Sequence, residues 1–273
     1  MTDHRRHQIG RAHPGDLEVV HGPLQRGARH VLHAGALQLP AVSIVALVGA
    51  NGAGKSTLLA TIAGVAPVAT GTLTATLGGS PIGALAYLPQ HASLPRWLTV
   101  AQYAHALGVP PAMLVADMFD AGLDTLVSRH AEALSGGERQ LVAAALALAR
   151  SRPVTLLDEP FTALDIRRRE RLAIRIARRR FERPDGVTII SSHDASELYA
   201  LCDWLVVVRD GTYVYQGSRD ALLARHGQPG SSPWAADVRR SPDCSRRAGV
   251  GPGAPRVARN ADGSGARSAG AVG

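Results

Sequence analysis

The sequence predicts an α/β fold built around a mostly parallel sheet. Short apolar runs without alternation, at residues 44–48, 154–157 and 187–191, are typical of strands that are buried on both faces. Helical patterns at residues 55–63 and 137–150 are interspersed with these strands. Because strands that alternate with helices form parallel sheets covered by helices, we expect a core in which helices flank the sheet.

Shorter β-like segments surround the first buried strand. Residues 17–20, 30–32 and 37–39 precede it, and residues 72–77 alternate threonine with apolar or small residues. Such alternation is typical of strands with one exposed face. The sequence therefore predicts an N-terminal antiparallel β subdomain beside the parallel core.

The middle of the chain changes to a helical pattern. After a short apolar strand at residues 85–88, residues 97–129 are rich in Ala and Leu and are interrupted at residues 108–111 by Gly-Val-Pro-Pro. Glycine and proline break helices. The pattern predicts a small inserted helical subdomain at about residues 91–133.

The last third of the chain returns to alternating elements. Residues 166–181 have an Arg-rich amphipathic pattern, and we expect their two triple-arginine runs on the solvated face of a helix. Asp210-Gly211, between apolar runs at residues 204–208 and 212–216, predicts a β-hairpin. A last helix is expected at about residues 218–225.

Both ends of the chain are predicted to be disordered tails. The net charge is +8, of which residues 1–15 supply +2 and residues 227–273 supply +4. The C-terminal segment is rich in Gly, Pro, Ser, Ala and Arg, so it cannot bury enough apolar surface to offset the entropy of ordering. The structured region, residues 16–226, is then nearly neutral, and a nucleic-acid partner is not expected.

The cysteine content fits a reducing compartment, and the hydropathy predicts no membrane-spanning segment. Cys202 and Cys244 offer no disulfide or metal framework. The longest apolar runs, residues 41–50 and 141–149, are shorter than the roughly 18 residues needed to span a bilayer. If the protein acts at a membrane, we expect another subunit to supply the membrane-spanning part.

A glycine-rich segment predicts a phosphate-binding loop. Lys55 is the only lysine among 30 lysine and arginine residues, and it lies in a G-x-x-x-x-G-K-[ST] motif at residues 49–57. An apolar strand precedes this motif and a helical pattern follows it, as a P-loop requires. The ammonium is expected to reach the β- and γ-phosphates and the Ser56 hydroxyl to bind Mg²⁺. The predicted nucleotide-binding residues here are Asn51, Gly52, Ala53, Gly54, Lys55, Ser56 and Thr57.

Two adjacent carboxylates follow the buried strand at residues 154–157. Asp158 is expected to hold Mg²⁺ directly or through water, and Glu159 is placed to orient and deprotonate an attacking water. Adjacent acids at a helix start are also a routine capping feature. The P-loop earlier in the chain favours the catalytic interpretation, with ATP as substrate and Mg²⁺ as cofactor.

Residues 134–140, Leu-Ser-Gly-Gly-Glu-Arg-Gln, resemble the signature motif of the ATP-binding-cassette (ABC) family. The resemblance covers the chain from about residue 17 to 226 and implies an ABC ATPase domain within residues 16–226. It implies that Ser135, Gly136 and Gly137 form a helix N-terminus that attracts the γ-phosphate of ATP held on an opposite subunit. Two cassettes, identical or different, are then expected to pair across two ATP molecules.

Three further residues match landmarks of the same family. Gln90, in Tyr-Leu-Pro-Gln, resembles the glutamine that reads the Mg²⁺ site and links it to the helical insert. Asp165, in Phe-Thr-Ala-Leu-Asp, resembles the residue that contacts the partner cassette. His193 follows a buried strand and resembles the histidine that hydrogen-bonds the γ-phosphate. The resemblance thus adds Gln90 and His193 to Glu159 as catalytic residues.

One family feature is missing. The family usually places an aromatic residue on an early strand to stack on adenine, but residues 16–40 contain no Tyr, Phe or Trp. His21 is the expected substitute, because an imidazole ring can still stack; the alternative is an ordinary surface histidine.

The resemblance implies the ATP-binding and ATP-hydrolysing subunit of a membrane transporter with a separate permease, held at the cytoplasmic face of the membrane. Residues 87–90 with Leu98-Thr99-Val100, and residues 213–217, resemble small exporters, so export is slightly preferred. The alternatives are an importer of a metal or small solute and, with less support, a soluble ABC ATPase that does not transport. Soluble repair-type members carry coiled coils or zinc modules, and residues 56–133 contain neither heptads nor cysteine pairs.

Overall fold

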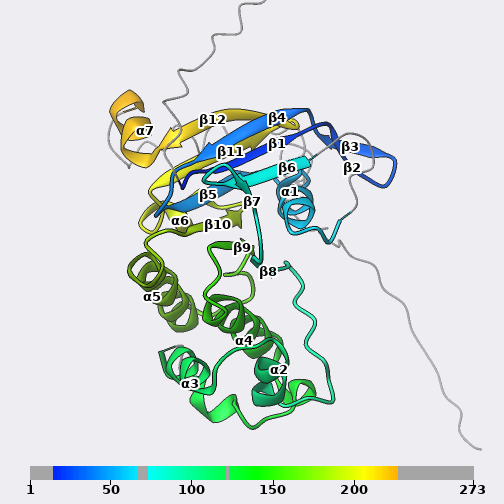
Figure 1. The fold of residues 1–273 in the computed structure, drawn as a ribbon, viewed down its shortest axis with the longest axis vertical. Coiled ribbons are helices and arrows are strands. Elements are labelled where there is room, and N and C mark those ends of the chain that lie inside the picture. Colours follow the sequence, from blue (N-terminus) through cyan, green and yellow to red (C-terminus); the bar gives the residue numbers. More distant parts are fainter. Residues whose placement is uncertain (1–14, 67–72, 121–122, 227–273) are drawn as a thin grey trace, which may run out of the picture. The chain divides into compact units, whose positions relative to one another are not determined.

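A six-stranded sheet with the strand order β12-β11-β5-β10-β9-β8 lies at the centre of the fold (Figure 1). Five strands run parallel, and β12 pairs antiparallel with β11 at one edge. This arrangement confirms the predicted α/β class with a mostly parallel sheet. The strands are β5 (Ile44–Gly49), β8 (Ala86–Leu88), β9 (Val154–Asp158), β10 (Val187–Ser192), β11 (Trp204–Arg209) and β12 (Thr212–Ser218).

The computed structural model describes residues 15–66, 73–120 and 123–226. They belong to one unit of the chain, Met1–Arg239, whereas the second unit, Arg240–Gly273, lies outside the described residues. The predicted disordered tails lie outside them too, apart from Gly15. No helix in the described ranges combines the length and apolar character needed to cross a bilayer.

The predicted antiparallel β subdomain is present as a four-stranded sheet with the order β4-β1-β6-β7. A separate two-stranded hairpin, β2-β3, accompanies it, and its first strand is too short to stand out in the sequence. The strands are β1 (Leu17–His21), β2 (Leu24–Arg26), β3 (Arg29–Leu32), β4 (Gly35–Leu39), β6 (Leu73–Leu77) and β7 (Ser80–Pro81).

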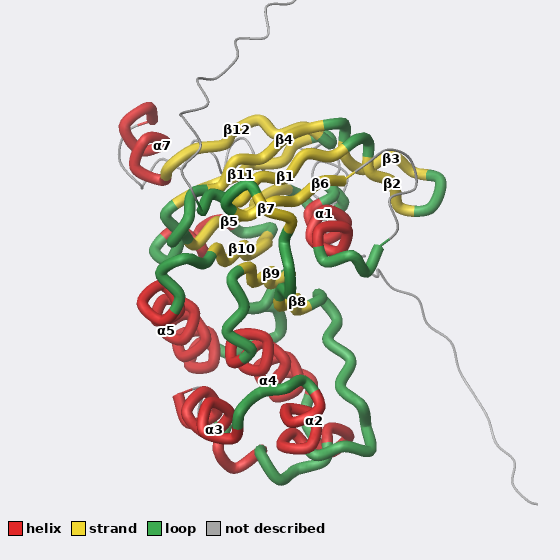
Figure 2. The backbone as a smooth tube through the Cα atoms, in the orientation of Figure 1, coloured by secondary structure: helices red, strands yellow, loops and turns green. Residues whose placement is uncertain are grey.

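Helix α1 (Lys55–Ile62) fills the space between the two larger sheets, as Figure 2 shows. Its Leu58, Leu59 and Ile62 side chains share one apolar core with inward residues of the antiparallel sheet and with Val45 and Leu47 of β5. The intervening residues of β5 face a second core on the other side of the central sheet. The uniform apolar character of β5 therefore reflects burial on both faces.

The second core contains α4 (Gly136–Ala149), which is buried along residues 140–149, and the inserted helices α2 (Val100–Ala106) and α3 (Pro111–Asp120). A capping box in which Thr99 and Gln102 exchange hydrogen bonds starts α2. Short 3₁₀ turns then lead the chain back to α4. The remaining elements are the 3₁₀ turns Asp124–Leu126 and Ala131–Ala133 and the helices α5 (Ile166–Glu182), α6 (Ala195–Tyr199) and α7 (Arg219–His226).

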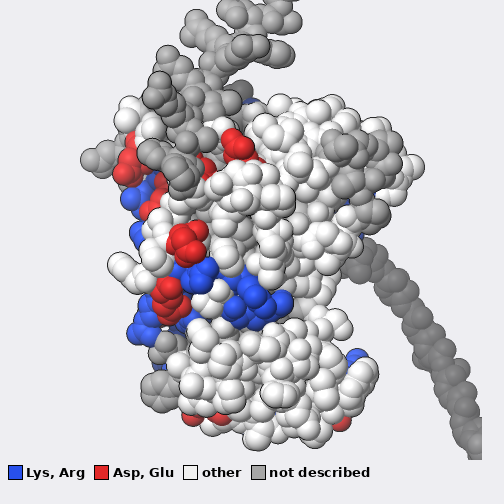
Figure 3. Space-filling model, viewed as in Figure 1, with Lys and Arg blue, Asp and Glu red and all other residues white. Residues whose placement is uncertain are grey.

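The arginine runs of α5 are only partly solvated, which corrects the sequence prediction. Figure 3 shows positive and negative side chains side by side around this helix, and Arg169 and Arg180 form ion pairs with acids outside it. Arg179, by contrast, is 3% exposed. Its guanidinium donates to the main-chain carbonyls of Leu148 and Arg152. It therefore ties α5 to the end of α4, a tertiary contact that helical periodicity does not reveal.

Candidate active site

The glycine-rich loop joins β5 to α1 in a conformation that requires glycine. Gly52 and Gly54 have φ angles of +82° and +99°, in the region that residues with a side chain rarely adopt. A Cβ on Gly54 would also lie 2.7 Å from Leu32 Cγ and 2.9 Å from the Val31 carbonyl oxygen. Strand β3 is thus packed directly against the loop, which leads its main-chain N–H groups into the N-terminus of α1.

Lys55 is held beneath this loop. Its side chain is 5% exposed, and Nζ donates hydrogen bonds to the carbonyl oxygens of Gly49 at 2.7 Å and Ala50 at 3.2 Å. Burial lowers the pKa of Lys55, and the nearby charges of Glu159 and Asp158 oppose that shift. An ammonium has three donors, so one remains for an anion bound in the loop.

The predicted Mg²⁺ ligands Ser56 and Asp158 are brought together at the ends of neighbouring elements. Ser56 Oγ donates a hydrogen bond to Asp158 Oδ1 at 3.1 Å, and Ser191 Oγ donates to the same oxygen at 2.5 Å. Asp158 is 1% exposed. A hydroxyl beside a carboxylate fits Mg²⁺, which prefers oxygen ligands and usually completes its shell with water and phosphate.

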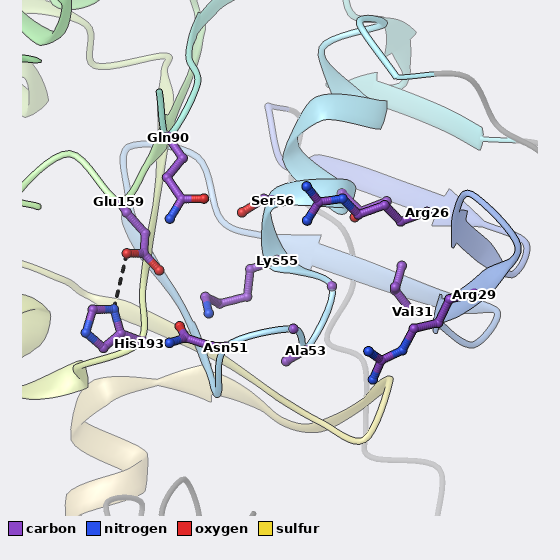
Figure 4. Close-up of a pocket in the computed structure, with 13 residues that line it drawn as sticks. Arg26, Arg29, Val31, Asn51, Ala53, Lys55, Ser56, Gln90, Glu159 and His193 are labelled. Carbon is purple, nitrogen blue, oxygen red and sulfur yellow. Dashed lines mark hydrogen bonds and ion pairs between the residues drawn. The ribbon is translucent and has the colours of Figure 1, made fainter. Parts of the chain in front are cut away.

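Glu159 has a strained main chain. Its φ is +47°, unusual for a residue with a side chain, and its N–H donates to Ser191 Oγ at 3.0 Å. Its Oε2 accepts a hydrogen bond from Thr162 Oγ1 at 3.1 Å and lies 3.2 Å from His193 Nδ1 (Figure 4). The carboxylate is therefore fixed in direction, with Oε1 making no hydrogen bond to the described part of the chain.

Lys55, Ser56 and Glu159 line one cavity of about 310 Å³, whereas Asp158 is not among its lining residues and adjoins it through Ser56. In Figure 4, Glu159, Gln90 and His193 lie at one end and the β2-β3 hairpin at the other, with the loop between them. The sequence-predicted residues that line the cavity are Asn51, Gly52, Ala53, Gly54, Lys55, Ser56, Thr57, Gln90, Glu159 and His193.

The predicted residues Ser135, Gly136, Gly137 and Asp165 do not line this cavity. Ser135 caps α4, where its Oγ accepts from the Glu138 N–H at 3.2 Å and its N–H donates to the Glu138 carboxylate at 2.8 Å. These bonds to Ser135 lower the pKa of Glu138. Asp165 caps α5 and is exposed, as are Ser135 and Gly136. These three therefore lie where a second molecule can contact them, whereas Gly137 is half-buried.

The prediction that His21 stacks on a nucleobase is wrong. Its side chain is 2% exposed, because alternation along β1 points it inward with Leu17 and Val19. Its Nε2 lies 2.6 Å from the Tyr213 hydroxyl, and its Nδ1 lies 2.7 Å from the Gly22 carbonyl oxygen. Both ring nitrogens are occupied within the protein, and the ring does not reach the cavity.

Sequence reasoning missed three cavity residues, Arg26, Arg29 and Val31, which come from the β2-β3 hairpin. The hairpin turn is Gly27-Ala28, with Gly27 at φ +61°. A glycine first in a two-residue turn is a hairpin signal, but the flanking strands have three and four residues and little alternation. The role of Ser191 was also missed, because a serine that ends a buried strand has no distinctive pattern.

Comparison with known proteins places these features in a family. The family described as ABC transporter matches residues 32–162. The molybdenum import ATP-binding protein ModC of Bordetella pertussis is 37% identical over 210 residues, which are 71% of this chain and 57% of ModC. This chain thus spans just over half the length of that relative.

Two other relatives are covered more fully. The hemin import ATP-binding protein HmuV of Streptomyces coelicolor is 34% identical over 78% of this chain and 82% of its own length. The thiamine import ATP-binding protein ThiQ of Jannaschia sp. is 34% identical over 70% of this chain and 88% of its own length. All three are named as import proteins, so the slight preference for export is not supported.

Solved structures share the fold. An ATP-binding subunit of an ABC transporter superposes with a TM-score of 0.70 at 24% identity, covering 82% of this chain and 98% of that one. A bacterial Atm1-family ABC exporter with ATP bound superposes with a TM-score of 0.67 at 26% identity, covering 81% of this chain and 42% of the exporter.

Replacing Ser191 by alanine is expected to destabilise the protein by about 1–3 kcal/mol. The change removes a donor to the buried Asp158 carboxylate and the acceptor of the Glu159 N–H, and unsatisfied buried polar groups carry a cost of this size. Urea denaturation of both proteins measures the difference. The matched control is Ser93→Ala, at an exposed position, which should stay within about 0.5 kcal/mol of wild type. Equal effects of the two changes would show that the network contributes nothing.

Proposed function

We propose that this chain, which belongs to the ABC transporter family, binds and hydrolyses ATP and thereby drives a transporter whose membrane-spanning subunits are separate polypeptides. The observation that carries the proposal is a cavity lined by the P-loop lysine, by Ser56 with its hydrogen bond to Asp158, and by a fixed Glu159 carboxylate. The ModC, HmuV and ThiQ relatives, all named as ATP-binding proteins, support the assignment.

The phosphates of ATP bind in the loop. The N–H groups of the loop and of the first turn of α1 donate to phosphate oxygens, and the third donor of Lys55 reaches the β- and γ-phosphates. Ser56 and Asp158 would hold Mg²⁺, which would neutralise charge that develops on the transferring phosphoryl group. Gln90 lines the same cavity, and its amide would face the Mg²⁺ site.

Glu159 acts as general base toward water. Its Oε2 is held by Thr162 and His193, so Oε1 is directed toward the cavity to accept the proton. As the water oxygen bonds to the γ-phosphorus, the bond from phosphorus to the β-bridging oxygen breaks and ADP leaves. His193 lies at the same end and donates to a γ-phosphate oxygen when it exchanges its contact with Glu159.

The exposed positions of Ser135, Gly136 and Asp165 support pairing of two cassettes. None of them lines the cavity of its own chain, yet the first two lie at the N-terminus of a 14-residue helix suited to a phosphate. We assign them to the ATP of a partner cassette, so that two nucleotides lie between two chains. A dimer formed by this chain alone in ATP would show that the partner cassette can be a second copy of the same chain.

A second, more apolar cavity supports docking of a permease. Its volume is about 150 Å³, and it lies between the segment after β8 and helices α2 and α4. Tyr103 of α2 and Leu107, directly after this helix, form one wall, and Arg150 supplies the only cation among the described lining residues. Pro89, also in the wall, precedes Gln90, so a segment seated here contacts the chain next to the nucleotide site. This seat would hold the ATPase at the cytoplasmic face of the membrane.

We assign the direction of transport as import, because all three relatives are named as import proteins. Their solutes, molybdenum, hemin and thiamine, are chemically unlike. Such variety is expected where the membrane-spanning subunits, rather than the ATPase, select the solute.

Glu159→Gln is expected to retain ATP binding, lower phosphate release at least about 100-fold and accumulate a dimer in ATP. The amide cannot accept the proton, while the phosphate-binding loop is unchanged, and general-base catalysis contributes about 10²- to 10⁴-fold. Phosphate release and size-exclusion chromatography with ATP measure the two effects. The matched control, Glu132→Gln, alters an exposed glutamate outside the cavity. A Glu159→Gln protein that hydrolyses ATP at the wild-type rate would exclude this role.

Tyr103→Glu is expected to release the chain from its membrane partners, because it places a carboxylate in the apolar wall of the second cavity. Tagged protein is purified from gently solubilised membranes and the co-purifying chains are identified. Met113→Glu, on the exposed side of α3, is the control and should retain them. Co-purification of a solute-binding protein supports import. Recovery of the wild type only in the soluble fraction, on ribosomes or DNA, would overturn the transporter assignment.

A further inference from the structure

The nucleoside end of the ATP cavity is formed by two arginines. Arg26 and Arg29 are paired across the β2-β3 hairpin, on either side of its two-residue turn. Figure 4 shows both side chains reaching from the hairpin toward the phosphate-binding loop, with Val31 between them in this view. Both line the cavity.

The hairpin is fixed relative to the loop. Strand β3 is packed so closely on Gly54 that no side chain would fit there. At the base of the strand, the His33 N–H donates to the Gly211 carbonyl oxygen at 2.8 Å, which joins the hairpin to the β11-β12 turn. The two arginines are therefore carried at a defined distance from the bound phosphates.

Neither guanidinium has an ion pair or hydrogen bond to another described residue, whereas four arginines of α5 have acidic partners. Two like charges directly opposite each other in an antiparallel pair destabilise a hairpin. The neighbouring pair on the same hairpin, Gln25 and His30, is hydrogen-bonded at 2.9 Å. Unlike Gln25 and His30, the two arginines of this hairpin do not bond to each other. Both instead line the cavity.

The orientation of the nucleotide follows from the other end of the cavity. Gln90, Glu159 and His193 surround the place of the γ-phosphate, so the rest of the nucleotide extends along the cavity toward the hairpin. No tyrosine, phenylalanine or tryptophan is among the described residues that line it. His21, the nearest candidate in the sequence, is buried with both ring nitrogens occupied.

We propose that Arg26 and Arg29 form the nucleobase platform of this protein, with guanidinium planes in place of an aromatic ring; the inference rests on the proposed ATP site. Guanidinium planes stack on bases through cation–π and π contacts. They carry donors and no acceptor. While one guanidinium stacks on the face of the base, the other can donate at the edge of the base to N7 of either purine and to O6 of guanine, but it cannot accept from the adenine N6 amino group. The platform therefore holds GTP at least as well as ATP.

Calorimetric titration of the full chain with Mg²⁺ and the β,γ-imido analogues of ATP and GTP tests the platform, with inorganic tripolyphosphate as a probe that has no base. Wild type should bind the GTP analogue as tightly as the ATP analogue or more tightly. Arg26→Ala and Arg29→Ala should each weaken both analogues about 3- to 30-fold, the range for loss of a cation–π contact, and weaken tripolyphosphate much less.

Three further variants separate stacking from charge. Arg26→Lys keeps the charge without the plane and should stay weak toward the analogues, while Arg26→Tyr restores a flat surface and should recover much of the affinity. Arg171→Ala removes an exposed arginine of α5 that has no acidic partner among the described residues and should leave all three affinities close to wild type. Thermal unfolding of each variant verifies that the fold is retained.

Three outcomes would each overturn the platform. If the alanine variants weaken the binding of tripolyphosphate as much as that of the analogues, the arginines contact phosphate instead. Full binding of the analogues by Arg26→Lys, or a tenfold preference of wild type for the ATP analogue, would also exclude it. The proposed function is tested separately by Lys55→Ala, which should lose tripolyphosphate as well as both analogues. If wild type binds none of the three probes, the ATP site and the platform fail together. If it binds all three and the arginine variants are unaffected, only the platform fails.

Discussion

The Asp158 carboxylate, buried and bonded to two serine hydroxyls, is the interaction on which the site depends. Ser56 lies in the first turn of α1, directly after the loop from β5, Asp158 ends β9 and Ser191 lies near the end of β10, so one carboxylate oxygen joins the N-terminus of α1 to the carboxyl ends of β9 and β10. Parallel strands bring these ends to one edge of the sheet. A buried carboxylate is costly unless it is hydrogen-bonded, and here the required bonds also fix the relative position of the loop and the acid. The same Ser191 hydroxyl accepts the Glu159 N–H, which extends the network to the proposed base.

That network also explains why Glu159 tolerates a left-handed main chain. A positive φ in a glutamate carries a cost, and it persists only where surrounding contacts determine it. Three contacts do so: Ser191 to its N–H, and Thr162 and His193 to one carboxylate oxygen. The strain turns the carboxylate from the end of β9 toward the cavity. At the same end of the cavity, Gln90 directly follows Pro89, which lines the apolar cavity beside α2, so the two cavities adjoin one segment of the chain.

The sequence was sufficient to predict those elements that have a strong sequence pattern. Strands β5, β9 and β10 are mostly apolar because both of their faces are buried, and the loop between residues 49 and 57 has a fixed spacing imposed by phosphate geometry. Where tertiary contacts decide, the sequence was insufficient. His21 was the expected stacking residue because residues 16–40 contain no Tyr, Phe or Trp, yet the pleat of β1 turns it inward to Tyr213. Arg179 looked solvated within an arginine run, yet two carbonyl groups at the end of α4 hold it. The export preference rested on short segments that do not determine direction, and three relatives named as importers outweigh it.

The use of a single lysine beside so many arginines has a physical explanation in this cavity. At the phosphate end, a narrow stem must pass beneath the loop and present one charge, and Lys55 does so while two carbonyl groups hold its ammonium. A planar guanidinium would need a wider passage, and the contact of Leu32 with Gly54 leaves no room to widen the loop. At the proposed nucleoside end the requirement is reversed, because a flat base is matched by a plane rather than by a point charge. Arginine at that end supplies both the flat surface and the positive charge. One cavity thus places the compact cation where charge is concentrated and the planar cations where surface is needed.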